Sequence, residues 1–239
     1  VPLLLARDID VSAHNWHIWM ESGGAVLGVA VVHDDGQYLH LISTSTGSAL
    51  HPPRLIGDYF IEYLGTLDSG FRIFLAKPYQ NSHLSALLAV NADATQVTRI
   101  SGTEIVENAV VGGTRVIART RVPGQDRLYK LYGLSDSLDV DFQIPVGQFL
   151  PHDMPPMLYS KSRRSFLVTT GQMYPEIDDE DHQHPQPIQL VAEVAEETAV
   201  VDGTRQLGGL ANFSATVSPS GRAMIVRGDT AQAQILAGN

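Results

Sequence analysis

The segment at residues 176–187, EIDDEDHQHPQP, holds the densest set of metal-ligand side chains in the chain. Carboxylate oxygens and imidazole nitrogens are the groups that Ca²⁺ or a transition metal binds. Because the segment lacks the turn glycine and closing glutamate of an EF-hand loop, a solvated acidic loop is the simpler interpretation. We therefore expect no cofactor, with Ca²⁺ or another divalent metal as the alternative. The candidate ligands are Asp178, Asp179, Asp181, His182 and His184.

Residues 14–22, HNWHIWMES, place both tryptophans of the chain beside two histidines. Side chains alternate along a strand, so in a strand that begins at Trp16, both His17 and Trp19 lie on the face opposite to Trp16. Trp16, His17 and Trp19 are candidates for binding a sugar or a cation by stacking. The alternative is that this strand packs against a neighbouring sheet and that the histidine bonds to backbone.

Residues 114–121, TRVIARTR, place three arginines on one side of a predicted strand. Arg115, Arg119 and Arg121 could bind an anion together with Arg163 and Arg164, since guanidinium groups suit carboxylate and phosphate. The alternative is a solvent-facing edge strand whose charges deter pairing with other chains.

Catalytic motifs are mostly missing from the sequence. It contains no G-x-S-x-G, P-loop, G-x-G-x-x-G or H-E-x-x-H pattern. Paired carboxylates for glycoside hydrolysis exist in principle, for example Asp8 or Asp10 with Glu62 and Glu104. A chain with 26 acidic residues contains such sets by chance, so we lean against an enzyme.

Composition indicates a globular, soluble, acidic protein. The 239 residues are 44% apolar and 18% charged, with a net charge of −10, which argues against a nucleic-acid surface. The absence of cysteine excludes disulfides and thiolate chemistry. No apolar run approaches the roughly 20 residues of a membrane span. The opening VPLLLARD lacks an initiator Met, so we expect a mature form or a fragment of a longer protein; the compartment stays open, an exported bacterial protein among the options.

A hairpin pattern recurs along the chain. VAVVHDDGQYLHLIST (residues 29–44) aligns without a gap on SATVSPSGRAMIVRGD (214–229), and the stretches at 63–78, 106–121 and, more weakly, 156–171 fit the same frame. Asp35-Gly36, Ser69-Gly70, Gly112-Gly113 and Ser220-Gly221 supply residues that tolerate a positive φ, as tight hairpins require. A second predicted strand pair follows three of these hairpins, and no stretch has sustained helical periodicity. The sequence therefore predicts an all-β fold.

ATVSPSGRAMIV resembles the SPDG hairpin of TolB-like and WD40-like β-propeller repeats, with Ser220 in place of the usual aspartate. The resemblance implies a β-propeller fold. The repeated units, each a hairpin followed by a second strand pair, predict about five four-stranded blades in a single domain over residues 1–239. We expect VPLLLA to supply an outer strand that closes the ring with the C-terminal hairpin. The strand at residues 15–22 has no place in five such blades, which leaves six as the alternative.

A propeller scaffold serves many functions. We expect a non-enzymatic binding module that engages a protein through its loop face, with a small molecule or glycan as another ligand and no nucleic acid. One alternative is a small-propeller glycan-active enzyme, such as a glycoside hydrolase, or a lectin. Another is a propeller gating domain of a larger hydrolase.

Overall fold

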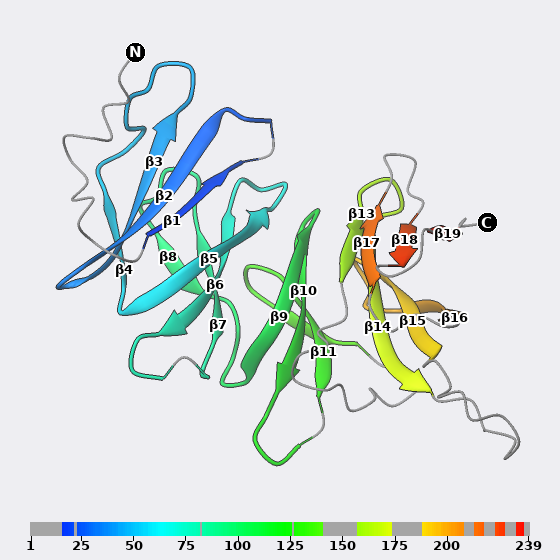
Figure 1. Ribbon diagram of the computed structural model, residues 1–239. Helices are drawn as coiled ribbons and strands as arrows, with labels where there is room; N and C mark the ends of the chain where they lie inside the picture. Colours follow the sequence, from blue (N-terminus) through cyan, green and yellow to red (C-terminus); the bar gives the residue numbers. More distant parts are fainter. Residues whose placement is uncertain are drawn as a thin grey trace, which may run out of the picture. The chain divides into compact units, whose positions relative to one another are not determined.

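The computed structural model describes residues 16–140 except 22, 82 and 126, and also residues 157–173, 188–207, 213–217, 223–227 and 233–236. Strands are the only regular elements in these ranges, and none of the ranges holds a helix that could cross a membrane. The strands form four four-stranded sheets and one three-stranded sheet, all antiparallel where their pairing is given (Figure 1). The all-β prediction is therefore confirmed.

The first two sheets lie in one compact unit, residues 1–107 with 133–136. In both sheets consecutive strands are neighbours. Sheet 1 consists of β1 (Trp16–Met20), β2 (Val26–His33), β3 (Gly36–Ser43) and β4 (Arg54–Gly57). Sheet 2 consists of β5 (Tyr59–Thr66), β6 (Arg72–Pro78), β7 (Ala86–Val90) and β8 (Val97–Arg99).

The second compact unit comprises residues 108–132 and 137–239. Most of sheet 3 belongs to it: β9 (Ile105–Gly112), β10 (Arg115–Arg121), β11 (Leu128–Tyr132) and β12 (Ser137–Asp139). Sheet 4 consists of β13 (Leu158–Ser160), β14 (Ser165–Met173), β15 (Ile188–Ala195) and β16 (Val201–Leu207). Sheet 5 consists of β17 (Phe213–Val217), β18 (Ala223–Arg227) and β19 (Ala233–Leu236).

All five predicted hairpins are present, but the first one occupies a different place in its sheet. The hairpins at residues 63–78, 106–121, 156–171 and 214–229 are the first and second strands of sheets 2, 3, 4 and 5. The hairpin at residues 29–44 is instead β2–β3, because β1 precedes it and pairs with β2. The strand that had no place is thus the first strand of sheet 1. The gapless alignment matched non-equivalent hairpins because every strand connection in an antiparallel meander is a hairpin.

The predicted turn glycines adopt the expected backbone where they are described. Gly36, Gly70 and Gly113 have φ values of 134°, 84° and 55°. In the hairpin without a turn glycine, Arg164 adopts this conformation, with φ 49°. Gly221 lies outside the described residues, as does the terminal segment VPLLLA, so ring closure stays a prediction.

The core of the first unit lies between one face of sheet 1 and one face of sheet 2. Trp19 is central to it: its ring stacks on Tyr63 with centroids 5.1 Å apart and meets the edge of Phe74 at 5.4 Å. Gly28, opposite Trp19 in the β1–β2 register, leaves the space that the indole fills. The buried Gln37 side chain joins the sheets, because its Oε1 accepts the Ile61 N–H at 2.7 Å.

The core of the second unit lies between sheets 3 and 4. Ile117, Tyr129 and Leu131 of sheet 3 pack with Phe166 and Val194 of sheet 4, and each of these side chains is almost fully buried. Buried and half-buried residues alternate along most of β11 and along the described parts of β14 and β15, which places the buried side chains on the facing sides of the two sheets. In β10, by contrast, consecutive residues are buried.

Candidate functional site

A pocket of about 300 Å³ opens at one end of sheet 2. All of its lining residues belong to the first unit. Sheet 2 and the β6–β7 connection supply its floor, and the end of β8 with the connection to β9 supplies its wall. The lining residues are Tyr59, Pro78, Leu84, Ala86, Arg99, Thr103, Glu104 and Ile105.

The floor of the pocket is an extension of the apolar face of sheet 2 beyond the buried core. Ile61, Ala76 and Ala86 are opposite one another across β5, β6 and β7, and all three are buried. Tyr59 and Pro78 pair with each other two positions away from Ile61 and Ala76, and so lie on the same face as those residues. They are only half-buried, and Leu84 beside them is 49% exposed. The apolar face therefore runs from the core into solvent at this point.

The wall of the pocket carries both charged groups. Arg99, the last residue of β8, donates from Nε to the Ser101 carbonyl at 3.2 Å and from Nη2 to the Gly102 carbonyl at 2.6 Å. The buried Glu104 accepts the Gly102 N–H at 3.3 Å through Oε1. These bonds hold the loop at residues 101–104 against the end of the sheet, so the wall is a fixed part of the site.

The structure places the predicted tryptophan and histidine candidates in different environments. Trp19 is 8% exposed, and Tyr63 donates its N–H to His17 Nε2 at 3.4 Å. This is the arrangement of the alternative interpretation, in which the strand packs against a neighbouring sheet and its histidine bonds to backbone. Trp16 lies on the opposite side and is 56% exposed. Trp16 and Trp19 therefore do not share a binding surface.

The predicted arginines do not lie on an edge strand. β10 runs between β9 and β11, so the edge-strand interpretation is wrong. The side of β10 that carries Arg115, Arg119 and Arg121 also carries the fully buried Ile117, and Arg119 itself is only 4% exposed. Arg121 alone of the three is exposed.

Arg163 and Arg164, the other members of the predicted anion site, already bind carboxylates. Arg163 forms a two-pronged pair with Glu193, with N···O distances of 2.6 and 2.8 Å. Arg164 lies 3.1 Å from Glu196 and 3.3 Å from Glu197. The positive charge of this hairpin is therefore largely compensated within the protein.

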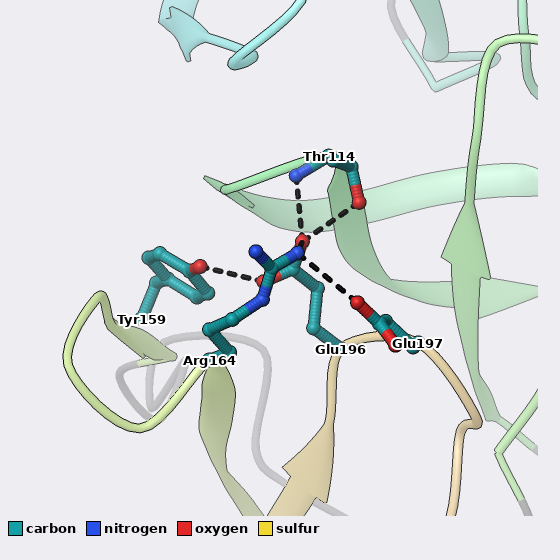
Figure 2. A network of polar contacts seen from close by, with 5 residues as sticks. All are labelled: Thr114, Tyr159, Arg164, Glu196 and Glu197. Atoms are coloured by element: carbon teal, nitrogen blue, oxygen red, sulfur yellow. Dashed lines mark hydrogen bonds and ion pairs between the residues drawn. The ribbon is translucent and has the colours of Figure 1, made fainter.

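Glu196 is the centre of a network of polar contacts in the second unit (Figure 2). Its Oε1 accepts both the N–H and the hydroxyl of Thr114 at 2.7 Å, and its Oε2 accepts the Tyr159 hydroxyl at 2.6 Å. Gly113 makes this approach possible, because a Cβ there would overlap the Glu196 carboxylate. The network joins the β9–β10 and β15–β16 hairpins to β13, which is a structural role.

The network controls the ionisation of Glu196. Burial alone would raise the pKa of the carboxyl group, but hydrogen bonds from Tyr159 and Thr114 and the charge of Arg164 hold the pKa below its usual value. Glu196 is thus a buried carboxylate that stays ionised, without the raised pKa of a general acid.

The remaining sequence candidates fall elsewhere. The metal candidates Asp178, Asp179, Asp181, His182 and His184 lie outside the described residues, as do Asp8 and Asp10. Glu62 pairs with Lys77 at 3.7 Å and is not a lining residue of the pocket. Within the described ranges, no three His, Asp or Glu side chains gather as they would around a metal ion.

Sequence reasoning named one pocket residue, Glu104, and missed the others. Tyr59, Pro78, Leu84 and Arg99 carry no motif, and they come together only through the pairing of strands. One hint of the pocket in the sequence is that an apolar residue stands near each end of the β6–β7 connection, Pro78 and Leu84.

Comparison with known proteins shows the fold. No family model and no curated protein matches the chain. Among solved structures, an oligogalacturonate lyase from Vibrio parahaemolyticus has a TM-score of 0.56 at 11% identity, covering 93% of this chain and 66% of the lyase. TolB from Acinetobacter baumannii has a TM-score of 0.53 at 13% identity, covering 93% and 54%. The Dos1 propeller has a TM-score of 0.51 at 9% identity, covering 93% and 58%.

The chain has a TolB-like β-propeller fold. The likeness extends over nearly the whole chain, and the resemblance drawn from the SPDG-type hairpin is confirmed at the level of the fold. The propeller spans 54% to 66% of the length of these three structures. At identities of 9% to 13% they carry no assignment of activity to its residues.

Proposed function

We propose that the chain is a non-enzymatic β-propeller binding module that holds a side chain of a protein partner in the pocket of sheet 2. The observation that carries this proposal is the floor of the pocket, where the apolar face of sheet 2 continues past the core to the half-exposed Leu84. An apolar surface that runs into solvent next to fixed polar groups is typical of an interaction site.

The size and shape of the pocket favour a protein partner over an enclosed small molecule. A volume of about 300 Å³ is at the lower limit of small-molecule sites, which surround most of the ligand. One aromatic side chain occupies about half of such a volume, since a cavity of about 150 Å³ holds a benzene ring. Anchors of this kind contribute much of the affinity of protein interfaces. The loop at residues 101–104 would then contact the partner around that anchor, in keeping with binding through a loop-bearing face.

Glycan chemistry is the second candidate, because the sequence offers carboxylates and one similar structure is an oligogalacturonate lyase. Glycoside hydrolysis needs two facing carboxyl groups. Glu104 is the single carboxylate among the lining residues described here, and Glu62 is engaged with Lys77. The binding module is therefore the better supported reading.

The five described sheets support a propeller of five blades. Closure of the ring by the terminal strands belongs to this proposal. The alternative of a gating domain within a larger hydrolase is consistent with the partial coverage of longer propellers. Sequencing of the complete reading frame separates these alternatives, because a gating domain requires an adjoining hydrolase domain.

A peptide-display selection on the immobilised full chain tests the function. We expect enriched peptides that share an apolar anchor, and we expect Leu84→Asp to weaken their binding at least tenfold in fluorescence anisotropy. Leu50→Asp is the matched control, since Leu50 is also an exposed leucine, at 41%, and does not line the pocket.

The proposal is overturned if the selected peptides bind Leu84→Asp and Leu50→Asp equally well. A glycan array on the same protein tests the second candidate. Glycan binding that Glu104→Gln abolishes, without any enriched peptide, would favour the glycan reading instead.

A further inference from the structure

We infer that the ligand of the sheet 2 pocket presents a carboxylate beside its apolar group, and that Arg99 binds this carboxylate at the rim. The inference rests on the proposed function, since it names the chemistry that the same pocket recognises. It depends on three features: the free donors of Arg99, the way the loop holds its guanidinium, and the position of Glu104.

Arg99 has unused hydrogen-bond donors and no counter-ion in the described part of the chain. Its two hydrogen bonds go to the carbonyls of Ser101 and Gly102, which are neutral groups. A guanidinium has five N–H groups, so about three remain after these two bonds. No Asp or Glu of the described residues forms an ion pair with Arg99, and the side chain is exposed.

The two bonds to the loop also fix the guanidinium in place. A free arginine side chain loses rotamer freedom when it binds a ligand, which weakens the net affinity. Arg99 is already held at the pocket wall by Nε and Nη2. Its remaining donors form a planar fork, which matches the two oxygens of a carboxylate better than a single charge does.

The position of Glu104 determines where in the pocket the carboxylate of the ligand can bind. Its carboxylate lines the same pocket from a buried position and is tied to Gly102. A ligand anion placed beside this carboxylate would be repelled by it, whereas an anion at the rim would be attracted by the exposed Arg99. The apolar part of the ligand therefore packs against the floor formed by Tyr59, Pro78 and Leu84.

Two sources supply an apolar group next to a carboxylate. One is the C-terminus of a protein whose last side chain is apolar, and the other is a free carboxylic acid of similar size. The probes are fluorescein-labelled peptides Gly-Ser-Gly-Ser-X, in which X is Leu, Phe, Val or Ser, each made as the free acid and as the amide. Unlabelled 3-phenylpropionate and hexanoate serve as free acids in competition.

The expected result is that apolar free-acid peptides bind at least tenfold more tightly than their amides. Arg99→Gln should remove that difference, and Arg99→Lys should restore only part of it because lysine keeps the charge but lacks the fork. The matched control is Arg54→Gln, which changes another exposed arginine of the same unit outside the pocket. Circular dichroism of each variant checks the fold, and Arg99→Lys remains informative if Arg99→Gln does not fold.

The outcomes separate the inference from the proposed function. If amides bind as tightly as free acids while Leu84→Ser still weakens both, the pocket binds peptides and the carboxylate inference is wrong. Loss of the acid preference in Arg54→Gln as much as in Arg99→Gln also overturns it. Displacement of the peptides by 3-phenylpropionate at micromolar concentration, with no preference for peptide acids, keeps the carboxylate and assigns a small acid as its source, against the proposed protein partner.

Discussion

At the scale of single residues, the second unit depends on one buried carboxylate. Glu196 accepts four hydrogen bonds or ion-pair contacts from Thr114, Tyr159 and Arg164. A buried charge is destabilising unless its lone pairs are filled in this way. The glycines at positions 112 and 113 complete the arrangement, because side chains there would overlap Tyr159 and Glu196.

Glu196→Gln should lower the free energy of unfolding by about 2 kcal/mol, the range measured for hydrogen bonds to charged groups. The amide nitrogen cannot accept the bonds that one carboxylate oxygen accepts, and the ion pair with Arg164 disappears. Urea unfolding followed by circular dichroism measures the change. Glu197→Gln, whose side chain is 73% exposed, is the control and should stay within about 0.5 kcal/mol.

The pH dependence of that difference follows from the lowered pKa of Glu196. The stability contributed by this group is fully present above the unfolded pKa of about 4.3 and is lost as the pH falls through the lower folded pKa. The difference between the wild type and Glu196→Gln should thus be constant near neutral pH and shrink below about pH 4. A difference that grows on acidification would contradict the lowered pKa.

Gly28→Ala should destabilise the first unit by about 1–3 kcal/mol, the usual range for overpacking. An added Cβ would overlap the indole of Trp19, which stacks on Tyr63 and has no room to move. Thermal unfolding of Gly28→Ala alone and combined with Trp19→Leu tests the cause. The double variant should lose less stability than the sum of the two single variants, because the smaller side chain removes the overlap.

At the scale of elements, a buried ion pair holds β6 to the end of β1. Arg72 donates from Nε to Glu21 and from Nη1 to the Ala92 carbonyl at 2.8 Å. The two charged side chains are only 6% and 13% exposed. This pair therefore links sheet 1, the β6 strand and the β7–β8 turn at one end of the first unit.

Arg72→Met should cost about 3–5 kcal/mol of unfolding free energy, because it leaves the Glu21 carboxylate buried without its partner. Lys77→Met is the matched control in the same strand: its pair with Glu62 is 3.7 Å long and exposed, so its loss should change stability by less than about 1 kcal/mol. Equal effects of the two variants in urea unfolding would contradict this expectation, because they would show that solvent weakens the Arg72–Glu21 pair as much as it weakens an exposed pair.

At the scale of the whole molecule, each compact unit has its own core and its own polar ties. Trp19 and Gln37 belong to the first, and Tyr129 and Glu196 belong to the second. None of the contacts described for Gly28 involves a contact partner of Glu196. Their energetic effects should consequently be separable.

The double variant Gly28→Ala with Glu196→Gln tests this separation. Its loss of unfolding free energy should equal the sum of the single losses within about 0.5 kcal/mol, as expected for sites without shared partners. A double-mutant cycle in urea gives the coupling directly. Coupling clearly larger than that would mean that the two sites interact energetically through the protein.

The sequence by itself determined the all-β fold and most hairpins. Strand alternation and turn chemistry are local properties, so Gly36, Gly70 and Gly113 could be predicted from a few neighbouring residues. Local patterns could not place the hairpin at residues 29–44, because one antiparallel connection resembles another wherever it lies in a sheet.

Only the tertiary structure decided which faces are buried and which residues meet. Trp19 and Arg119 are buried because a second sheet covers their side of the strand, and no local pattern states which side that is. Glu196 and Thr114 are 82 residues apart in the sequence. The pocket joins Tyr59 to Glu104 in the same way, through strand pairing that brings distant segments together, and it is this pairing that creates the one site for which a function is proposed.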